Sequence, residues 1–298
     1  MSKTVYFLDI DDTLIKTTSI TQDHRNALKS ALQSLKIERA NEIVSDFSAT
    51  YSNLYATHQG KMLSNKDPKD LENFVKSLTE LEKFIIEKYG EIKIWSREAA
   101  LYISAEKYGI TLSNHNLSDL SNTLWNKITQ NASFYPDSLP FLDYLNTQKA
   151  PFYLISASDC RLTLDEKTGY FEYDPLYSRN LKLKRFEILY QKGIDKKQVY
   201  VGDPYDKPNP WVFLEALNQA KSDVKEKFTS IMIGDSIKND LLPAKKAGMD
   251  KIIWLNRGSA KEKEVRKDRI MAINKLTVDL SIPLFSKQRI QIAQSCKD

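Results

Sequence analysis

The chain has 298 residues, of which 41% are hydrophobic and 28% are charged, and these proportions exclude a disordered chain and a membrane-embedded one. Lysine and arginine outnumber aspartate and glutamate by 44 to 39, and a net charge of +5 over this length falls short of a nucleic-acid-binding surface. Two distant cysteines, Cys160 and Cys296, exclude a disulfide framework and a cysteine-rich zinc site, and three histidines argue against a histidine-built metal site.

The first residues, MSKTVYFLDIDD, indicate a cytoplasmic protein. They hold one lysine, a short apolar run and three acids within four positions, whereas a signal peptide needs a longer apolar stretch. No window of the sequence reaches 18 consecutive apolar residues, the length that a membrane-spanning helix requires. We therefore expect neither a membrane nor a nucleic acid among the partners.

Five short apolar runs have the composition of buried strands, because each is rich in β-branched or aromatic residues and ends abruptly at polar or turn residues. Helical periodicity follows the third run over residues 211–220 and the fourth over 241–248. Strands that alternate with helices predict a parallel sheet with covered faces, which is an α/β fold. The five predicted strands are residues 5–8, 152–155, 199–201, 231–233 and 252–255.

Between residues 8 and 152 the sequence carries helical rather than strand periodicity. Apolar residues recur at helical spacing over 27–35 and over 71–85. The second stripe has a start signal in Asp67 and Pro68 and a stop signal at Gly90, which predicts one helix between them. An insertion of this size predicts a helical subdomain that returns to the sheet near residues 134–136.

A charge-dense stretch of mixed sign covers residues 261–269 near the end of the chain, and we interpret it as a solvated helix or loop.

Acidic residues follow two of the predicted strands, at the end where α/β sheets bind ligands. Asp9, Asp11 and Asp12 come after the first strand, and Asp235 and Asp240 follow the fourth. Each group alone is more simply interpreted as an acidic turn or a helix cap. Several carboxylates around one crevice are unfavourable unless a cation neutralises them, and carboxylate oxygens select Mg²⁺. Together the two groups predict a magnesium site.

Two further residues occupy positions that suit an anion. Lys207 lies in the segment DKPNPW, directly before a predicted helix whose start is positively polarised. Ser156 ends the second predicted strand, where its hydroxyl and the next backbone N–H can bind a phosphate oxygen. Taken alone, the lysine is more often an ordinary surface residue and the serine a turn residue.

These four elements, in this order and each at the end of a strand or the start of a helix, resemble the four motifs of the haloacid dehalogenase superfamily. The resemblance covers residues 1–16 and 133–258 and implies a Rossmann-like, three-layer parallel sheet. The helical insertion resembles the type 1 cap of that family, so we expect a core of residues 1–16 and 133–298 and a cap of residues 17–132. The matching positions are Asp9, Asp11 and Thr13 in the first motif, Ser156 in the second, Lys207, Pro208 and Pro210 in the third, and Gly234, Asp235 and Asp240 in the fourth.

The resemblance implies a phosphatase that works through an aspartyl-phosphate. Asp9 is the implied nucleophile, and Asp11 is the implied general acid that later acts as the base. Lys207 is expected to neutralise the transferring phosphoryl group and to position Asp9, while Ser156 is expected to bind phosphoryl oxygens.

The resemblance also implies a bound Mg²⁺. Its expected ligands are the carboxylates of Asp9 and Asp235 and the backbone carbonyl of Asp11. Asp240 is expected to support the metal through water or Lys207 rather than to bind it directly.

Two residues distinguish this sequence within the family pattern. Asp11 favours phosphate-ester hydrolysis, because an alkoxide leaving group needs a proton from an acid that the dehalogenase branch lacks. Asp12 stands where glycine is frequent, and we expect the aspartate to be tolerated. Residues 163–173 have the character of a small hairpin, too short for a second cap.

A cap that closes over the site excludes water and limits substrate size, so we expect a small phosphorylated metabolite such as a sugar phosphate or a nucleotide. Two other interpretations remain open. One is a phosphotransferase or mutase that passes the phosphoryl group to a second substrate, and the other is a non-catalytic binding protein on the same fold.

Residues of the insertion that are candidates to contact the substrate are more simply interpreted as ordinary surface groups. These candidates are His58, Lys61, Arg97 and Lys127. His24 and His115 are interpreted in the same way, as surface groups. Trp125, like Trp95 and Trp254, is interpreted as a core residue.

Overall fold

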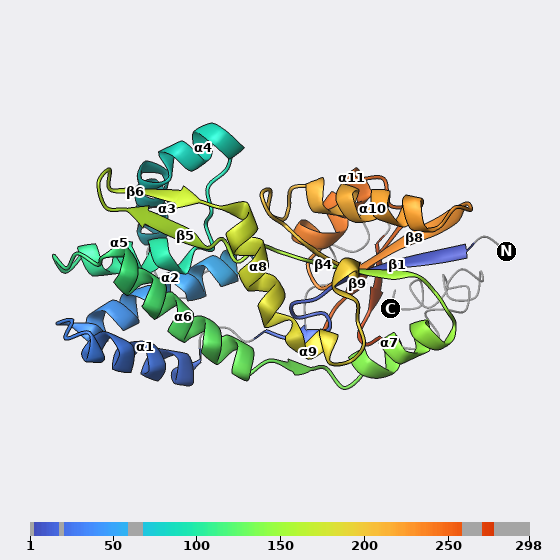
Figure 1. Ribbon diagram of the computed structural model, residues 1–298, viewed down its shortest axis with the longest axis horizontal. Helices are drawn as coiled ribbons and strands as arrows, with labels where there is room; N and C mark the ends of the chain where they lie inside the picture. The colour runs from blue at the N-terminus through green and yellow to red at the C-terminus, as the bar shows by residue number, and fades with distance from the viewer. Residues whose placement is uncertain (1–2, 18–20, 59–67, 258–269, 277–298) are drawn as a thin grey trace, which may run out of the picture.

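The computed structural model shows a parallel sheet covered by helices and, beside it, a separate layer of helices (Figure 1). The structure describes residues 3–17, 21–58, 68–257 and 270–276, and the statements below concern these residues. The sheet with its covering helices confirms the predicted α/β class. The charge-dense stretch 261–269 lies outside the described residues.

Six parallel strands form the main sheet, in the order β10-β9-β8-β1-β4-β7. The five predicted strands are confirmed. The sixth, β10, was not predicted; its three apolar residues form a short strand at the edge of the sheet and are not fully buried. The strands are β1 (Lys3–Asp9), β4 (Phe152–Ser156), β7 (Val199–Val201), β8 (Phe228–Gly234), β9 (Lys251–Leu255) and β10 (Met271–Ile273).

Strand β1 lies between β4 and β8, and this placement gathers the chemistry at one edge. The pairing of β1 with β4 sets Asp9 opposite Ile155, and β8 pairs with the other side of β1. Asp9, Ser156 and Gly234 are therefore the last residues of three neighbouring parallel strands. The carboxyl ends of such strands meet at the same edge of a sheet, where α/β proteins bind ligands.

Helices cover both faces of the sheet, which makes the three-layer, Rossmann-like arrangement expected from sequence. Successive residues of a strand point to opposite faces. Leu8 accordingly belongs to a buried cluster with Phe141 of α7, whereas Phe7 belongs to another with Phe213 of α10. The helices of this part are α7 (Ser138–Thr147), α8 (Pro175–Arg185), α9 (Glu187–Tyr190), α10 (Trp211–Asp223) and α11 (Leu242–Lys246).

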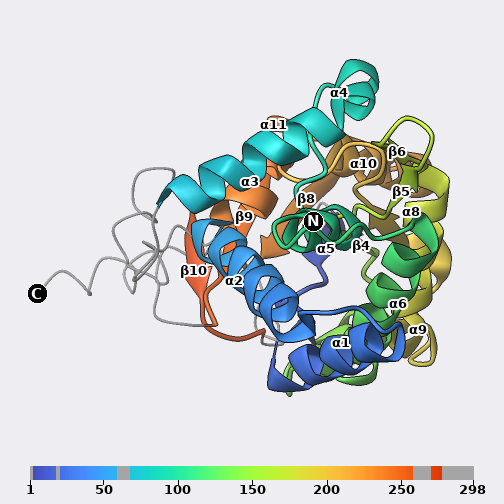
Figure 2. The ribbon, with the colours of Figure 1, turned by 90° about the vertical axis from the view of Figure 1, so that its left-hand side faces the viewer.

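The helical insertion leaves and rejoins the sheet at one point, where β2 (Ile15–Lys16) pairs antiparallel with β3 (Ser133–Phe134). Figure 2 shows its helices in front of the sheet. No described helix has both the length and the apolar character needed to span a bilayer. The helices of the insertion are α1 (Gln22–Ser34), α2 (Ala40–His58), α3 (Pro68–Leu81), α4 (Lys83–Tyr89), α5 (Arg97–Glu106) and α6 (Asn114–Gln130).

The prediction of a single helix that ends at Gly90 is wrong. The structure has two helices, α3 and α4, which are separated at Glu82. The Glu82 carboxylate accepts a hydrogen bond from the backbone N–H of Lys93 at 2.6 Å, a contact that local periodicity does not reveal. The predicted stop is confirmed, since Gly90 caps α4 with a left-handed φ of 74°. Asp67, the predicted cap at the start, lies outside the described residues.

The hairpin expected over residues 163–173 is present as β5 (Leu162–Asp165) and β6 (Tyr170–Tyr173). Its inward side chains, among them Leu164 and Phe171, belong to the same buried cluster as Phe74 of α3 and Leu101 of α5. Figure 1 shows the hairpin among the helices of the insertion. A segment that follows β4 in sequence therefore completes the hydrophobic core of the cap, which the predicted boundary at 132 leaves out.

This packing predicts that Phe171→Ala lowers the free energy of unfolding by about 3–5 kcal/mol, because the fully buried ring leaves a cavity. Glu172→Ala, on the exposed side of the same strand, is the matched control and changes it by less than about 0.5 kcal/mol. Urea denaturation measures both values. Equal effects of the two substitutions would contradict the role of the hairpin in the cap core.

Candidate active site

Asp9 and Lys207 form the centre of the site. Asp9 ends β1 and is 4% exposed. The Lys207 Nζ donates to Asp9 Oδ1 at 2.6 Å, to Asp240 Oδ1 at 2.7 Å and to the carbonyl of Ile155 at 3.1 Å. One buried ammonium group therefore joins the ends of β1 and β4 to the segment after β8.

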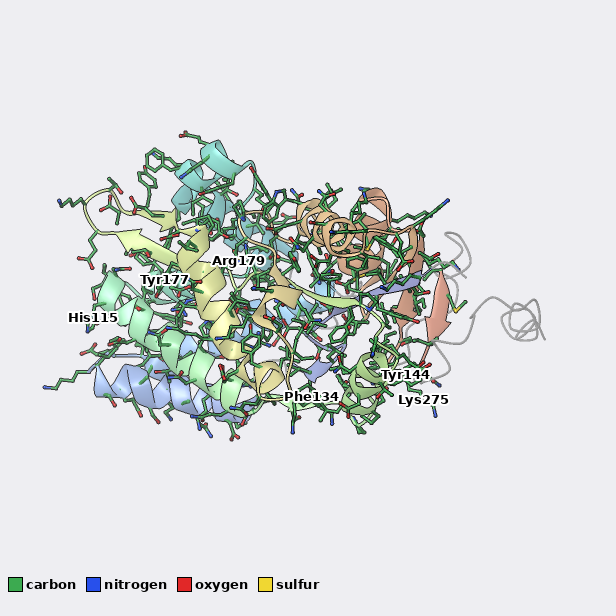
Figure 3. All side chains as sticks on the ribbon, turned by 45° about the vertical axis from the view of Figure 1, so that its right-hand side comes forward. His115, Phe134, Tyr144, Tyr177, Arg179 and Lys275 are labelled. Carbon is green, nitrogen blue, oxygen red and sulfur yellow. The ribbon has the colours of Figure 1, made fainter. Side chains whose placement is uncertain are left out.

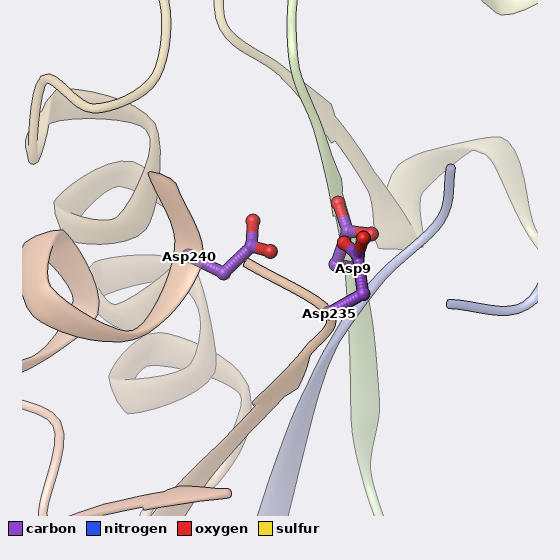
Figure 4. A group of neighbouring side chains, drawn as sticks. All are labelled: Asp9, Asp235 and Asp240. Atoms are coloured by element: carbon purple, nitrogen blue, oxygen red, sulfur yellow. The ribbon is translucent and has the colours of Figure 1, made fainter. Parts of the chain in front are cut away.

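Asp235 completes a group of three carboxylates with Asp9 and Asp240. Each offers one oxygen, and these oxygens lie within 4.8 Å of one another. Figure 4 shows Asp9 and Asp235 together at the strand ends, with the carboxylate of Asp240 turned toward them. Burial, reinforced by the neighbouring carboxylates, raises the pKa of both Asp9 and Asp235 above the ordinary range.

The charges of this group fit a divalent cation. Three carboxylates face one ammonium, that of Lys207, so the fully ionised group carries two negative charges in excess. Asp9 Oδ2 is buried and has no hydrogen-bond partner among the described residues. Hard carboxylate oxygens in this number suit Mg²⁺. The positions of Asp9 and Asp235 are compatible with their predicted roles as metal ligands. Asp240 contacts Lys207, as expected, and its carboxylate also belongs to the group of three.

Gly234 allows Asp240 to approach the end of β8. A Cβ atom at position 234 would lie 2.6 Å from Asp240 Cβ and 2.7 Å from its Oδ2. Asp240 belongs to a short π-helical turn, Ile237–Leu241, and its Oδ2 accepts a hydrogen bond from the backbone N–H of Ser236 at 3.0 Å. Such turns are frequent at functional sites. The close approach of Asp240 thus explains why the predicted fourth motif has glycine at position 234.

Asp11 points to a different set of partners. Its Oδ2 accepts hydrogen bonds from Lys182 Nζ at 2.8 Å and from Ser156 Oγ at 2.9 Å. Its Oδ1 accepts from Thr17 Oγ1 at 2.7 Å and from the Arg185 guanidinium. Burial alone would raise the pKa of Asp11, but the charges of Arg185 and Lys182 hold it well below the usual range. The carboxylate is therefore ionised in this arrangement.

Lys182 and Arg185 were not predicted from sequence. They lie three residues apart on α8 and are almost completely buried, and Lys182 also contacts Asp159 at 2.8 Å. In the sequence they belong to the stretch KLKR, which has the composition of an ordinary solvated helix end. Figure 1 shows α8 between the sheet and the cap. This placement by the fold brings the two cations into contact with Asp11.

Ser156 is fully buried at the end of β4. Its hydroxyl donates to Asp11 and lies 3.2 Å from the Ala157 carbonyl oxygen. The structure thus brings Ser156 to the predicted edge and aims its hydroxyl at Asp11. The expected contact of this hydroxyl with a phosphoryl oxygen stays a prediction.

Asp12 connects the core to the cap. Its φ of 60° lies in the left-handed region, which glycine adopts freely and aspartate tolerates, and this explains why the position suits glycine. Its carboxylate accepts hydrogen bonds from the Thr17 backbone N–H at 2.9 Å and from the Tyr55 hydroxyl of α2 at 3.0 Å. A cap helix therefore lies directly above the first motif.

The histidine and lysine candidates of the insertion have different outcomes. His24 is completely buried, so its interpretation as a surface group is wrong. His115 is exposed at the outer end of α6, where Figure 3 shows it far from the strand ends. Lys127 is half-buried on the same helix. The side chain of His58 and all of Lys61 lie outside the described residues.

Comparison with known proteins points to one superfamily. A family model described as HAD-hydrolase-like matches residues 204–278, which include Lys207, Asp235 and Asp240. The 2-haloacid dehalogenase of Pseudomonas syringae pv. Tomato DC3000 aligns with a TM-score of 0.50 and 21% identity, over 94% of this chain and 97% of that one. The match of residues 204–278 to this family model agrees with the resemblance of the four sequence motifs to the haloacid dehalogenase superfamily. A proposed β-phosphoglucomutase from Thermotoga maritima aligns with a TM-score of 0.50 and 17% identity, over 92% and 94% of the two chains.

A search among curated proteins gives no match. The two structural relatives carry different activities in their descriptions, and at these identities they show the shared fold. The reaction of this protein must therefore be argued from its own residues.

Gly234→Ala is expected to weaken Mg²⁺ binding by about tenfold or more, because the added methyl group displaces Asp240 from the carboxylate group. Isothermal titration of the protein with Mg²⁺ measures the affinity, and circular dichroism checks that the variant is folded. An unchanged affinity in a folded variant would contradict the steric role of the glycine.

Mg²⁺ binding is expected to release protons and to strengthen as pH rises. The pKa values of Asp9 and Asp235 are raised, so part of this group is protonated near neutral pH and a bound cation must displace those protons. Titrations in buffers of different ionisation enthalpy count the protons released. Binding that is independent of pH from mildly acidic to mildly alkaline conditions would refute this expectation.

Proposed function

We propose that this protein is a Mg²⁺-dependent phosphatase that hydrolyses a small phosphate monoester through an aspartyl-phosphate on Asp9. The observation that carries the proposal is the state of the Asp9 carboxylate. One oxygen is held by Lys207 at 2.6 Å, and the other is buried without a partner among the described residues, next to the carboxylates of Asp235 and Asp240. A carboxylate fixed in this way is oriented to act as a nucleophile.

Lys207 has two roles in the proposed reaction. Its hydrogen bond to Oδ1 fixes the orientation of Asp9 and directs Oδ2 toward the reacting phosphorus. Its positive charge, held in a buried place between strand ends, offsets the negative charge of the phosphoryl group. Burial lowers the pKa of a lysine, but the carboxylates of Asp240 and Asp9 outweigh this effect and raise the pKa of Lys207, so the group stays charged.

Asp9 and Asp235, with Asp240 beside them, would hold the Mg²⁺, and the bound ion would reduce the repulsion between the nucleophile and an anionic substrate. Asp240 also accepts a hydrogen bond from Lys207 at 2.7 Å, so it links the lysine to the same group of oxygens. These residues belong to the part of the chain that the family model matches, except for Asp9 itself.

Asp11 is proposed as the proton-transfer residue. In its ionised form, held by Lys182 and Arg185, it is the base that activates water to hydrolyse the aspartyl-phosphate. The first step needs the protonated form, which requires that these ion pairs loosen. Release of the proton then restores the ion pairs, so the two cations favour the form of Asp11 that the second step uses.

A small phosphorylated metabolite is the proposed substrate class. The contact between Tyr55 of α2 and Asp12 places the cap close to the first motif, which limits the size of a molecule that reaches Asp9. A cytoplasmic location stays a prediction of the sequence. Asp11 argues for phosphate chemistry over the dehalogenation of the Pseudomonas syringae relative, because carbon–halogen cleavage needs no acid at this position.

The direct test is hydrolysis of p-nitrophenyl phosphate in the presence of Mg²⁺. Asp9→Asn should lower kcat by at least about a thousandfold, because it removes the nucleophile. Asp143→Asn, an exposed substitution on α7, is the matched control and should leave kcat unchanged. Equal activity of wild type and Asp9→Asn would refute the proposal.

The product of the same assay separates a hydrolase from a phosphotransferase or mutase. The proposal predicts stoichiometric release of inorganic phosphate without any acceptor, and loss of this release when the divalent cation is chelated. Phosphate release only after a second substrate is added would favour group transfer.

Asp11→Asn should harm alkyl phosphates more than aryl phosphates, because p-nitrophenolate leaves without a proton whereas an alkoxide needs one. We expect the rate of the first step to fall by about a hundredfold more with glycerol 3-phosphate than with p-nitrophenyl phosphate. Rapid-quench measurement of aspartyl-phosphate formation isolates this step. Equal losses for both substrates would contradict Asp11 as the acid.

A further inference from the structure

The indole ring of Trp125, on α6 of the cap, lies between two arginine side chains. The guanidinium carbon of Arg97 is 4.4 Å from the ring centroid, and that of Arg185 is 5.2 Å from it. Arg185 also binds Asp11. Arg185 therefore connects the Trp125 ring to Asp11 of the candidate active site, at the junction of the cap with the core.

Arg97 is a cation without an acidic partner among the described residues. It is half-buried at the first position of α5, and its guanidinium contacts the aromatic rings of Trp125 and of Tyr51, the latter at 5.6 Å. The other buried arginines of this junction are paired, Arg161 with Glu98 and Arg185 with Asp11. A planar guanidinium that keeps its charge and lacks a carboxylate is suited to bind an incoming anion.

Two buried hydrogen-bond donors on the contacting helices α1 and α6 also lack acceptors. The Nε1 of Trp125 and the Nε2 of His24 are buried and have no hydrogen-bond partner among the described residues. The Nδ1 of His24 accepts a hydrogen bond from the Thr21 backbone N–H at 2.9 Å, so the neutral ring carries its proton on Nε2. Burial, together with the charges of Arg97 and Lys127, lowers the pKa of His24 and keeps the ring neutral.

Arg97, Trp125 and His24 thus form a cluster of donors without acceptors, which we call the donor cluster. A buried donor that lacks an acceptor costs about 1–3 kcal/mol, and two such groups in the same part of the cap as an arginine without an acidic partner are unusual unless a ligand supplies the acceptors. We propose that the donor cluster binds a second anionic group of the substrate, a carboxylate or a phosphate distinct from the phosphoryl group that Asp9 attacks. This inference rests on the proposed phosphatase function.

The charges around the donor cluster agree with this assignment. Lys182 and Arg185 are balanced by Asp11 and Asp159, which they contact, so the positive charge of Arg97 remains uncompensated. The carboxylates of Asp9, Asp235 and Asp240 form a separate group at the strand ends. A substrate with the transferred phosphoryl group at one end and a second anion at the other matches both regions.

Matched pairs of phosphate esters test this inference. Glycerol 3-phosphate and 3-phosphoglycerate are similar in size, and only the second carries a carboxylate. Fructose 6-phosphate and fructose 1,6-bisphosphate form the corresponding pair for a second phosphate. The wild-type protein is expected to have a KM lower by about tenfold or more for one doubly anionic member than for its partner, and the pair that responds identifies the anion.

Arg97→Met should abolish this preference, so that the ratio of the two kcat/KM values of the responding pair falls to about one. Arg97→Lys should restore only part of it, because lysine keeps the charge but not the planar pair of donors. Arg25→Met, on the exposed side of α1, is the control and should keep the wild-type ratio. Absence of any preference in the wild type, or equal changes in the Arg97→Met and Arg25→Met variants, would overturn the inference.

A binding measurement keeps this test separate from the test of catalysis. In the Asp9→Asn background, isothermal titration with 3-phosphoglycerate and glycerol 3-phosphate should show the same preference, and Arg97→Met should remove it. Fructose 1,6-bisphosphate and fructose 6-phosphate are titrated in the same way. If the wild type binds the doubly anionic ester more tightly but hydrolyses neither ester, the phosphatase proposal is refuted and the anion site is supported. If it hydrolyses the esters but shows no preference in binding, the anion site is refuted and the phosphatase proposal is supported.

Discussion

The contact of the Lys207 ammonium with Asp9 and Asp240 is the interaction on which the rest of the site depends. Three carboxylates cannot be buried together without compensating positive charge, because each would repel the others in a region of low polarity. Lys207 supplies one charge and fixes the position of two carboxylates, and a divalent cation would supply the rest. The parallel register of β4, β1 and β8 makes this arrangement possible, since it brings three strand ends to one edge.

Around this centre, buried cations connect the first motif, helix α8 and the cap. Helix α8 carries Lys182 and Arg185 to Asp11, and Arg185 also contacts the ring of Trp125 in the cap. The β5–β6 hairpin, which follows the second strand of the core in sequence, packs inside the cap. Two elements that lie outside the insertion in sequence, the hairpin and α8, therefore pack against or contact the cap.

Local sequence patterns were sufficient to predict the five main strands and the acids that follow them, because a buried strand needs a continuous apolar run and its ligand-binding end follows from topology. They were not sufficient for Lys182 and Arg185, whose burial depends on contacts with residues far away in sequence. The break at Glu82 and the burial of His24 were missed for the same reason, since each depends on tertiary packing that overrides local periodicity.

The most direct measurement of the central claim is to locate the phosphoryl group during turnover. Protein quenched in acid while it hydrolyses a phosphate ester with Mg²⁺ can be digested and mapped by mass spectrometry, because aspartyl-phosphates survive in acid. The account predicts a phosphoryl group on the peptide from β1, at Asp9. Turnover with this peptide unmodified, or with the phosphoryl group on another residue, would contradict it.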